Sequence, residues 1–393
     1  MTINNRVNMI DGIRGFSLFG ILMANLLIFQ YGLFGKDEIS LLSLSATDLF
    51  AYKLIKIFIE GSFMPIFTFL FGYGMIKMKE SLERKELKVK RHFVRRFIFL
   101  GAIGLVHSTL LWEGDILLLY GMMGFFLLLF MNRKSKTVLV WGIILLLLTS
   151  LFGYGNESGT IEDKAILEQY VKDTFEIYGS GTYNEITYHR NNVDPLNLPD
   201  YMYIVLLLLA PIASAPLFLL GMYAAKKQRF TDPAKEQDLY IKYALFFVPI
   251  GLLLKSLVYI IPNQSWVGIG SLLGANMLSL GYIYLMALGY KQGTLLFKSF
   301  EAVGKLSMTN YLLQTVICTT IFYGYGFGLF GKLGIVNAFF LGIIIYSLQV
   351  SLSYLYLKRF RSGPFEKMIR IWTYFTLSGK PRIKASIENK RIA

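Results

Sequence analysis

Cysteine and histidine are both rare in this chain. Its 393 residues include one cysteine, Cys318, and three histidines. A single cysteine cannot form an intramolecular disulfide or a cysteine-rich metal site. Three histidines scattered along the sequence also argue against a structural zinc site. We therefore expect no disulfide and no bound metal.

Charged residues are sparse as well. They make up 17% of the chain, whereas 54% of the residues are hydrophobic and are gathered into long runs. A water-soluble chain would alternate polar and apolar positions, and a bilayer core of roughly 30 Å needs about 20 apolar residues per helix. The sequence therefore predicts an all-α, polytopic membrane protein with about ten transmembrane helices. The predicted segments are residues 9–30, 51–77, 95–112, 115–131, 137–153, 201–225, 240–261, 266–290, 303–323 and 336–357. The first lacks the small residues of a cleavage site, so we expect it to be retained.

Basic residues are divided unevenly between the two sides of the predicted bundle. With the N-terminus inside, the inner side carries 32 of the 40 Lys and Arg residues and 10 of the 25 Asp and Glu residues. Because an excess of basic residues marks the cytoplasmic side, we expect both termini in the cytoplasm, with the chain in the plasma membrane. Residues 1–357 then form the membrane domain and 358–393 a basic tail. The net charge of +15 favours contact with anionic membrane lipids. Because these residues are spread over every inner loop, we expect no nucleic-acid partner.

Residues 154–200 form one sizeable polar excursion, predicted to be extracytoplasmic. It carries nine acidic and three basic residues, with a predicted helix over 162–178 followed by Gly-Ser-Gly at 179–181. A connection of this length is usually functional, so we expect a lid or a docking surface. Glu185 and Arg190 are candidate contacts to a substrate, and a solvated loop surface explains them equally well.

An ionisable side chain, His107, stands inside one apolar segment. Such a group costs roughly a few kcal/mol in a membrane, and it usually has a partner and a function. Asp115 or Glu113 would orient the imidazole as a general base. Eight residues along one helix span about 12 Å, so His107 meets Asp115 only if the chain turns at residues 112–114. The alternative is a structural histidine that donates to a carbonyl of a neighbouring helix.

Four segments carry a family resemblance. They are residues 11–25 (DGIRGFSLFGILMAN), 67–74 (FTFLFGYG), 104–120 around His107, and 303–314 (VGKLSMTNYLLQ) with its downstream companion 360–366 (FRSGPFE). Together they resemble the YeiB-like bacterial membrane proteins, the family of the domain of unknown function 418. The likeness spans nearly the whole chain.

That family is itself similar to the transmembrane acyltransferases, such as heparan-α-glucosaminide N-acetyltransferase and the acyltransferase-three proteins. The shared element is Asp-x-x-Arg-Gly with an Asn fourteen residues after the Asp, here Asp11, Arg14 and Asn25. The resemblance implies transfer of an acyl group from a coenzyme A donor to an acceptor beyond the membrane. The heparan enzyme has its catalytic histidine eleven residues after the Asn, where this chain has Lys36. His107 is the natural replacement as the base.

Polar residues of the first predicted helix have two interpretations each. Arg14 could bind the phosphates of a nucleotide-bearing donor, with Asp11 beside it, or the two could form a local ion pair with Arg14 reaching the interface. Asn25 could be a donor to an oxyanion or a polar contact between helices.

A polar stripe follows one face of the ninth predicted span. Ser307, Asn310, Tyr311 and Gln314 recur at helical spacing, which puts them on one side. Such a stripe should face the bundle interior, where it lines a cavity or forms a polar seam between helices. We expect a cavity, with Asn310 and Gln314 as substrate contacts.

These observations favour a membrane acyltransferase. It would transfer an acyl group from a cytoplasmic acyl-coenzyme A donor to an extracytoplasmic hydroxyl or amine on a small molecule, glycan or lipid. The competing hypothesis is a transporter of a small polar or lipid-linked solute, which broken helices or paired repeats would favour. A scaffold explains the loop but not the buried polar groups. A homo-oligomer remains open on sequence alone.

Overall fold

The computed structural model describes residues 8–42, 44–155, 161–196 and 198–381, and every long element among them is a helix. Their bounds are α1 Asn8–Tyr31, α2 Ala46–Phe58, α3 Met64–Glu83, α4 Val89–Leu110, α5 Leu117–Met131, α6 Ser135–Ser150, α7 Ile161–Ser180, α8 Tyr183–Asn192, α9 Asp200–Lys226, α10 Gln237–Ile260, α11 Val267–Gly289, α12 Leu295–Lys305, α13 Ser307–Phe322, α14 Ile335–Arg359 and α15 Pro364–Tyr374. The predicted all-α class is confirmed.

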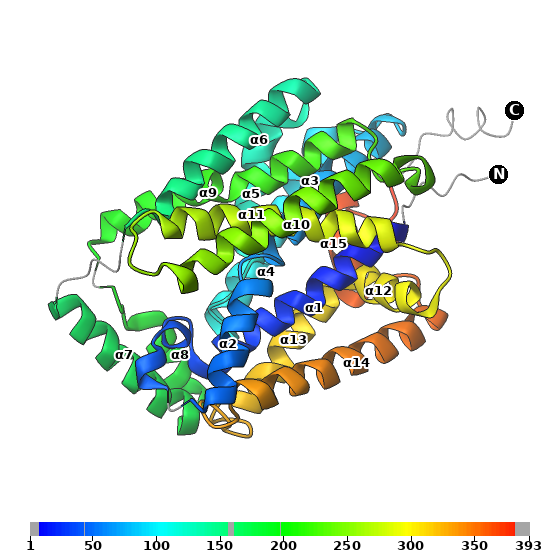
Figure 1. The fold of residues 1–393 in the computed structure, drawn as a ribbon. Coiled ribbons are helices and arrows are strands. Elements are labelled where there is room, and N and C mark those ends of the chain that lie inside the picture. The colour runs from blue at the N-terminus through cyan, green and yellow to red at the C-terminus, as the bar shows by residue number, and fades with distance from the viewer. Residues whose placement is uncertain (1–7, 43, 156–160, 197, 382–393) are drawn as a thin grey trace, which may run out of the picture.

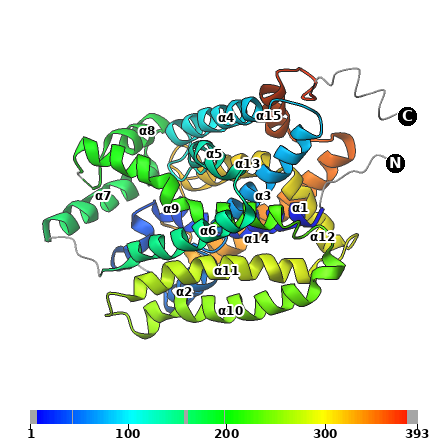
Figure 2. The same cartoon turned by 90° about the horizontal axis from the view of Figure 1, so that it is seen from above.

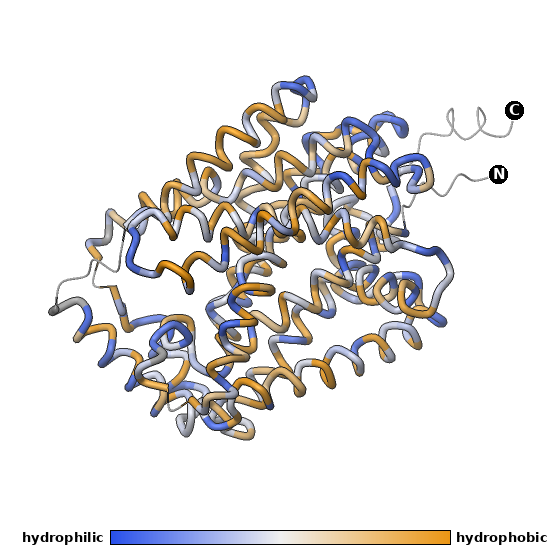
Figure 3. Tube along the Cα trace, in the orientation of Figure 1, coloured by the Kyte–Doolittle hydropathy of each residue, from blue (hydrophilic) through white to orange (hydrophobic). Residues whose placement is uncertain are grey.

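Seven helical segments of the described chain are long and apolar enough to cross a membrane: α1, α4, α6, α9, α10, α11 and α14. The shorter apolar helix α5 adds to them. Their apolar bodies dominate the hydropathy trace, and the polar residues collect toward helix ends and connections (Figure 3). Large apolar side chains such as Leu208 and Leu245 are about 70% exposed, as expected for helix faces that meet lipid. The chain is a multi-pass membrane protein.

Two of the ten predicted segments are each divided between two helices. Segment 51–77 breaks into α2 and α3 around residues 59–63, where Gly61 has a positive φ of 71° and Pro65 stands in the first turn of the new helix. Segment 303–323 breaks at Leu306, whose backbone angles of −111° and 31° end α12 before α13 begins. Apolar runs do not reveal such breaks, because both halves stay apolar.

The bundle has two distinct ends (Figures 1 and 2). α7 and α8 lie at one end, together with the start of α2. The beginning of α1, α12 and α15 lie at the opposite end. We call these the α8 end and the α15 end. The polar excursion and the C-terminal helix α15 therefore lie at opposite ends of the bundle.

Close helix packing explains the glycine of the Arg-Gly pair near the N-terminus. A Cβ atom on Gly15 would lie 2.0 Å from the carbonyl oxygen of Phe300 in α12, and one on Gly304 would lie 1.9 Å from that of Asp11. Only glycine permits such an approach of two helix backbones. The pair α1–α12 therefore holds Arg14 at a fixed place at the α15 end.

Candidate active site

His107 and Asp115 meet because the chain turns between them. α4 ends at Leu110 and α5 starts at Leu117, so the chain reverses direction and brings Asp115, in the turn before α5, back to His107 of α4. The His107 Nδ1 atom lies 2.8 Å from Asp115 Oδ1, and the two side chains are only 2% and 1% exposed. A Cβ on Gly104 would lie 2.1 Å from the Leu118 nitrogen, so this glycine is what lets the two helices pack so closely. The turn predicted at residues 112–114 is present.

Asp115 is held from a second direction. Its other oxygen, Oδ2, accepts the backbone N–H of Leu118 at 2.7 Å, in the first turn of α5. A carboxylate in this position satisfies a helix amide that has no partner within its helix and benefits from the helix dipole. Asp115 thus contacts His107 with one oxygen and the start of α5 with the other.

A third residue completes the group. The Nε2 atom of His107 lies 3.0 Å from the hydroxyl of Thr315 on α13, and Thr315 is 1% exposed. Sequence reasoning missed Thr315, which is 208 residues from His107 along the chain. The available signal was its position one turn after Tyr311, next to the predicted polar stripe.

Tyr311 holds the turn in place. Its hydroxyl donates to the carbonyl of Gly114 at 3.2 Å and accepts the N–H of Ile116 at 3.3 Å. Its ring centroid lies 5.6 Å from that of His107. The α4–α5 turn, and with it Asp115, is therefore fixed against α13.

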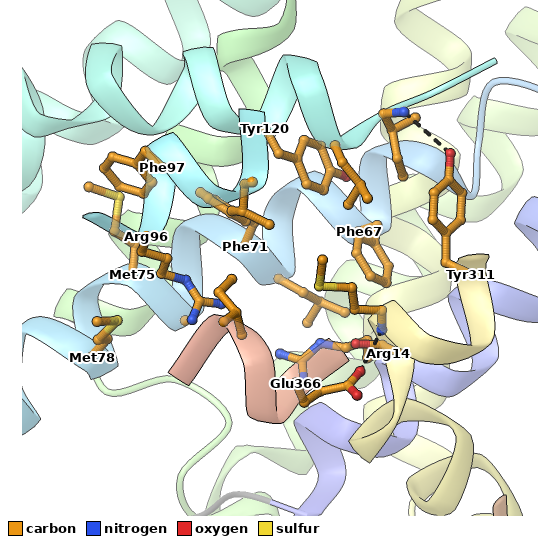
Figure 4. Close-up of a pocket in the computed structure, with 18 of the residues that line it drawn as sticks. Arg14, Phe67, Phe71, Met75, Met78, Arg96, Phe97, Tyr120, Tyr311 and Glu366 are labelled. Atoms are coloured by element: carbon orange, nitrogen blue, oxygen red, sulfur yellow. Dashed lines mark hydrogen bonds between the residues drawn. The ribbon is translucent and has the colours of Figure 1, made fainter. Parts of the chain in front are cut away.

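A cavity of about 300 Å³ reaches Tyr311 from the α15 end. Figure 4 shows Arg14, Arg96 and Glu366 along one edge of it and the rings of Phe67, Phe71 and Tyr120 along the other. Cationic groups from four helices border it, and the rest of the lining is mostly apolar. The cationic residues are Arg14, Arg96, Lys305 and Arg370, and the apolar ones include Phe67, Leu70, Phe71, Met75, Met78, Phe93, Phe97, Leu100, Ile116 and Leu117.

Glu366 ties the C-terminal segment to the start of α13. Its carboxylate accepts the backbone N–H groups of Met308 and Thr309 at 2.8 and 3.1 Å, and the Thr309 hydroxyl at 2.6 Å. It thereby caps the N-terminus of α13. A Cβ on Gly363 would lie 2.2 Å from this carboxylate, which explains the glycine of the Gly-Pro-Phe-Glu motif.

The predicted donor contacts near the N-terminus lie at the cavity. Arg14 lines it and also bonds Asp11, with 2.9 Å between Nη1 and Oδ1. The ion pair and the cavity-facing position thus coexist. Asn25 lies deeper on α1, half-buried, and its side chain has no hydrogen bond to the His107 group.

The polar stripe of α13 divides between two environments. Ser307 and Tyr311 line the cavity. Asn310 instead donates to the Ser353 hydroxyl at 2.9 Å, and Gln314 donates to the Gln349 side chain at 2.9 Å, both on α14. The structure therefore places Asn310 and Gln314 in a polar seam between helices, away from the cavity lining.

The polar excursion covers the end of α4 beyond His107. Tyr183 of α8 donates to the Leu110 carbonyl at 2.7 Å, and Arg190 donates to those of Leu111 and Thr109 at 3.1 and 2.8 Å. These are helix-end carbonyls that have no partner within α4. Glu185 closes a capping box with Thr182 at the start of α8, and these hydrogen bonds lower the pKa of Glu185. Arg190 thus anchors the excursion to the end of α4, and Glu185 stabilises α8.

Glu113 lies beneath this cover. One of its carboxylate oxygens is shielded from solvent and has no hydrogen-bond partner among the described residues. Burial raises the pKa of Glu113, although the nearby charge of Arg190 and the Tyr178 hydroxyl act in the opposite direction. The neighbouring Trp112 stacks on Phe29 of α1 with 4.2 Å between ring centroids.

Lys36, at the position of the heparan enzyme's histidine, belongs to a different cluster. Its ammonium nitrogen lies 2.6 Å from a Glu60 oxygen and 2.5 Å from an Asp37 oxygen, and Lys56 joins the same two carboxylates. The cluster lies between α1, α2 and the loop before α3 and does not line the cavity.

Comparison with known proteins places the chain in a family. Residues 224–376 match the family model described as "Protein of unknown function (DUF418)". "Uncharacterized protein YxaH" of Bacillus subtilis (strain 168) is 33% identical over 402 residues, which cover 97% of each chain. This chain belongs to the YeiB-like family. "Uncharacterized protein YeiB" of Escherichia coli (strain K12) is 24% identical over 94% of this chain and 95% of that protein. The "Uncharacterized 39.9 kDa protein in amylase 3'region" of Bacillus acidopullulyticus is 23% identical over 95% of each. No solved structure matches.

All four sequence segments that resemble the YeiB-like proteins border the same cavity. Segment 11–25 contributes Arg14, segment 67–74 contributes Phe67 and Phe71, and segment 104–120 contributes Ile116. Segment 303–314 contributes Tyr311, and its downstream companion 360–366 contributes a carboxylate. Segments that are far apart along the chain therefore line a single cavity.

Proposed function

We propose that this YeiB-like protein is an acyltransferase of the bacterial plasma membrane. In this proposal, an acyl-coenzyme A donor binds in the cavity from the cytoplasmic α15 end. The acyl group passes to a hydroxyl or amine of a cell-surface glycan or lipid at the α8 end, with His107 as the base. The observation that carries the proposal is a cavity with a cationic rim and an apolar interior that ends at Tyr311, whose ring lies beside that of His107.

The cavity matches the chemistry of such a donor. Coenzyme A carries phosphates, which arginine side chains bind well, and its acyl chain is apolar. Arg96 fits this role because it forms no ion pair with a carboxylate in the described part of the chain, although it lines the cavity. With Arg14, Lys305 and Arg370 beside it, the rim has four cationic groups and one carboxylate, that of Glu366.

The chemistry of the imidazole supports the same function. An acceptor hydroxyl or amine must lose a proton when it attacks a thioester, and a histidine held by a carboxylate is suited to take it. Asp115 fixes the Nδ1–H tautomer and leaves Nε2 as the basic atom. Tyr311 lines the cavity, and its ring centroid lies 5.6 Å from that of His107.

One observation favours a second candidate, export of an amphipathic anion. α12 and α13 are two halves of an interrupted helix, and the interruption at Leu306 borders the cavity residues Lys305 and Ser307. Interrupted helices often form the substrate sites of transporters. A transporter has no need of an oriented base, however, and the His107–Asp115 pair therefore favours the enzyme.

Donor binding tests the proposal through two adjacent arginines. Arg96 lines the cavity, whereas Arg95 lies over the Phe375 ring at 4.0 Å. In titration calorimetry of detergent-purified protein with palmitoyl- and acetyl-coenzyme A, Arg96→Ala should weaken binding about 10- to 100-fold, the value of one charge-assisted contact. Arg95→Ala should change it less than about twofold. Equal effects, or no binding by the unaltered protein, would overturn the proposed donor site.

A further inference from the structure

The hydroxyl of Thr315 differs from those of three other threonines in the apolar helices. Thr109, Thr149 and Thr320 each donate to a carbonyl of their own helix one turn earlier, at 2.7 to 2.8 Å. This is the usual way for a threonine to satisfy its hydroxyl within a helix. Within the described residues, Thr315 makes no such bond, and its hydroxyl oxygen instead lies 3.0 Å from His107 Nε2. The contact with the imidazole replaces the ordinary backbone bond.

The direction of this hydrogen bond follows from Asp115. Asp115 Oδ2 accepts the Leu118 N–H, and Oδ1, which as a carboxylate oxygen has no proton to donate, lies 2.8 Å from His107 Nδ1. Nδ1 therefore carries the proton, and Nε2 is left with its lone pair. Thr315 must then be the donor to Nε2. A hydroxyl that donates to an imidazole oriented by a carboxylate is the arrangement of an activated oxygen nucleophile.

We propose that Thr315 is the catalytic nucleophile, which accepts the acyl group as an ester before the acceptor receives it. This inference rests on the acyltransferase function proposed above. It assigns Thr315 Oγ1 as the attacking atom, His107 as the base and acid, and Asp115 as the residue that positions the imidazole.

The two half-reactions balance. In the first, Thr315 Oγ1 attacks the thioester carbonyl as its proton moves to His107 Nε2. The carbon–sulfur bond then breaks, and the departing coenzyme A sulfur takes that proton. In the second, an acceptor hydroxyl or amine gives a proton to Nε2 and attacks the ester carbonyl. The Thr315 oxygen leaves and recovers the proton, so no other reactant is needed.

The position of Thr315 suits an intermediate carrier. It lies one turn beyond Tyr311 on α13, about 6 Å further from the α15 end. α13 continues toward Tyr323, whose ring contacts that of Tyr178 in α7 with 4.8 Å between centroids. Thr315 thus lies between the cavity and the excursion. An ester at Thr315 lets the donor and the acceptor bind from opposite ends of the bundle at different times. Tyr311 lies between the cavity and Thr315, so its side chain must move before the thioester can reach Thr315.

The experiment is acylation of the purified protein without an acceptor. Acetyl-, butyryl- and palmitoyl-coenzyme A are each added, and intact-protein and peptide mass spectrometry are combined with a thiol assay for released coenzyme A. We expect up to one acyl group per chain on the peptide that contains Thr315, with one coenzyme A released for each. Thr315→Ser should still form the ester. Thr315→Val and His107→Gln should lose it.

Thr319→Val is the matched control. Thr319 is also buried on α13, but its hydroxyl donates to the Val316 carbonyl of its own helix, so this variant should acylate normally. Two results would show that Thr315 is not the nucleophile while leaving the acyltransferase function in place. The first is continuous release of coenzyme A in the presence of membrane extract with no adduct on the protein. The second is the same continuous release by Thr315→Val. If the unaltered protein forms no adduct and releases no coenzyme A, both proposals fail.

Discussion

Replacing His107 by glutamine separates a catalytic role from a structural one. Glutamine has a similar volume and can still donate to Asp115, but it cannot take a proton. At most one buried hydrogen bond, that to Thr315 or to Asp115, is lost or weakened, which costs about 1–3 kcal/mol of stability. Removing a general base costs about 10²–10⁴ in rate.

These two magnitudes are easily distinguished. A protein stable by about 5 kcal/mol or more that loses 3 kcal/mol remains almost entirely folded, so a structural role would leave activity nearly unchanged. We therefore expect His107→Gln to shift the unfolding temperature slightly and to reduce coenzyme A release at least 100-fold. Thermal unfolding and the thiol assay would be measured on the same preparation. Asp115→Asn should also lower the rate strongly, because an amide does not hold the imidazole in the Nδ1–H tautomer that leaves Nε2 free to take a proton. Full activity of His107→Gln would refute the reasoning.

Three other predictions concern stability and topology. Glu366→Gln removes the charge that caps α13 and should destabilise the protein by about 1–2 kcal/mol in denaturant unfolding, whereas an unchanged stability would mean that the cap contributes nothing. Burial raises the pKa of Glu113 above its ordinary value of 4.5, so the protonated form favours the fold and stability should fall as the pH rises through the raised pKa. Between about pH 4 and 8, the melting temperature of Glu113→Gln should therefore depend less on pH than that of the unaltered protein. The same pH dependence in both proteins would contradict the assignment. A reporter fused after Ala393 should be cytoplasmic and one inserted at Gly159 extracytoplasmic, both positions lying outside the described residues; the opposite result would exchange the donor and acceptor sides.

The sequence predicts the fold class well because bilayer thickness fixes the length of an apolar run. The interruptions near residue 60 and at Leu306 are invisible to that argument. They depend on local backbone angles and on capping by Glu366, which is 57 residues from its partner Thr309. Hydropathy measures where a segment can reside and not whether its helix is continuous.

The candidate site was predictable in part. His107 and Asp115 stand out as ionisable residues of an apolar stretch, and their contact follows once the chain turns. Thr315 carries no such signal, because a threonine in a membrane helix usually satisfies its own hydroxyl. Asn310 and Gln314 belong to the same polar stripe as Tyr311, but their hydrogen bonds to α14 place them in a seam between helices. Long-range packing therefore determines which polar residues of a stripe are available for chemistry.

The most direct test follows the two parts of a doubly labelled donor. The donor is acyl-coenzyme A with one radioisotope in the acyl group and another in the adenine. It is added to the outside of vesicles that contain a cell-wall and lipid extract. The purified protein is inserted in the vesicle membrane with its α15 end outward. The account predicts that the acyl label enters and becomes attached to material within, while the adenine label stays outside, and that His107→Gln abolishes the separation. Entry of both labels together would contradict the account and establish a transporter, and retention of both outside would contradict transfer altogether.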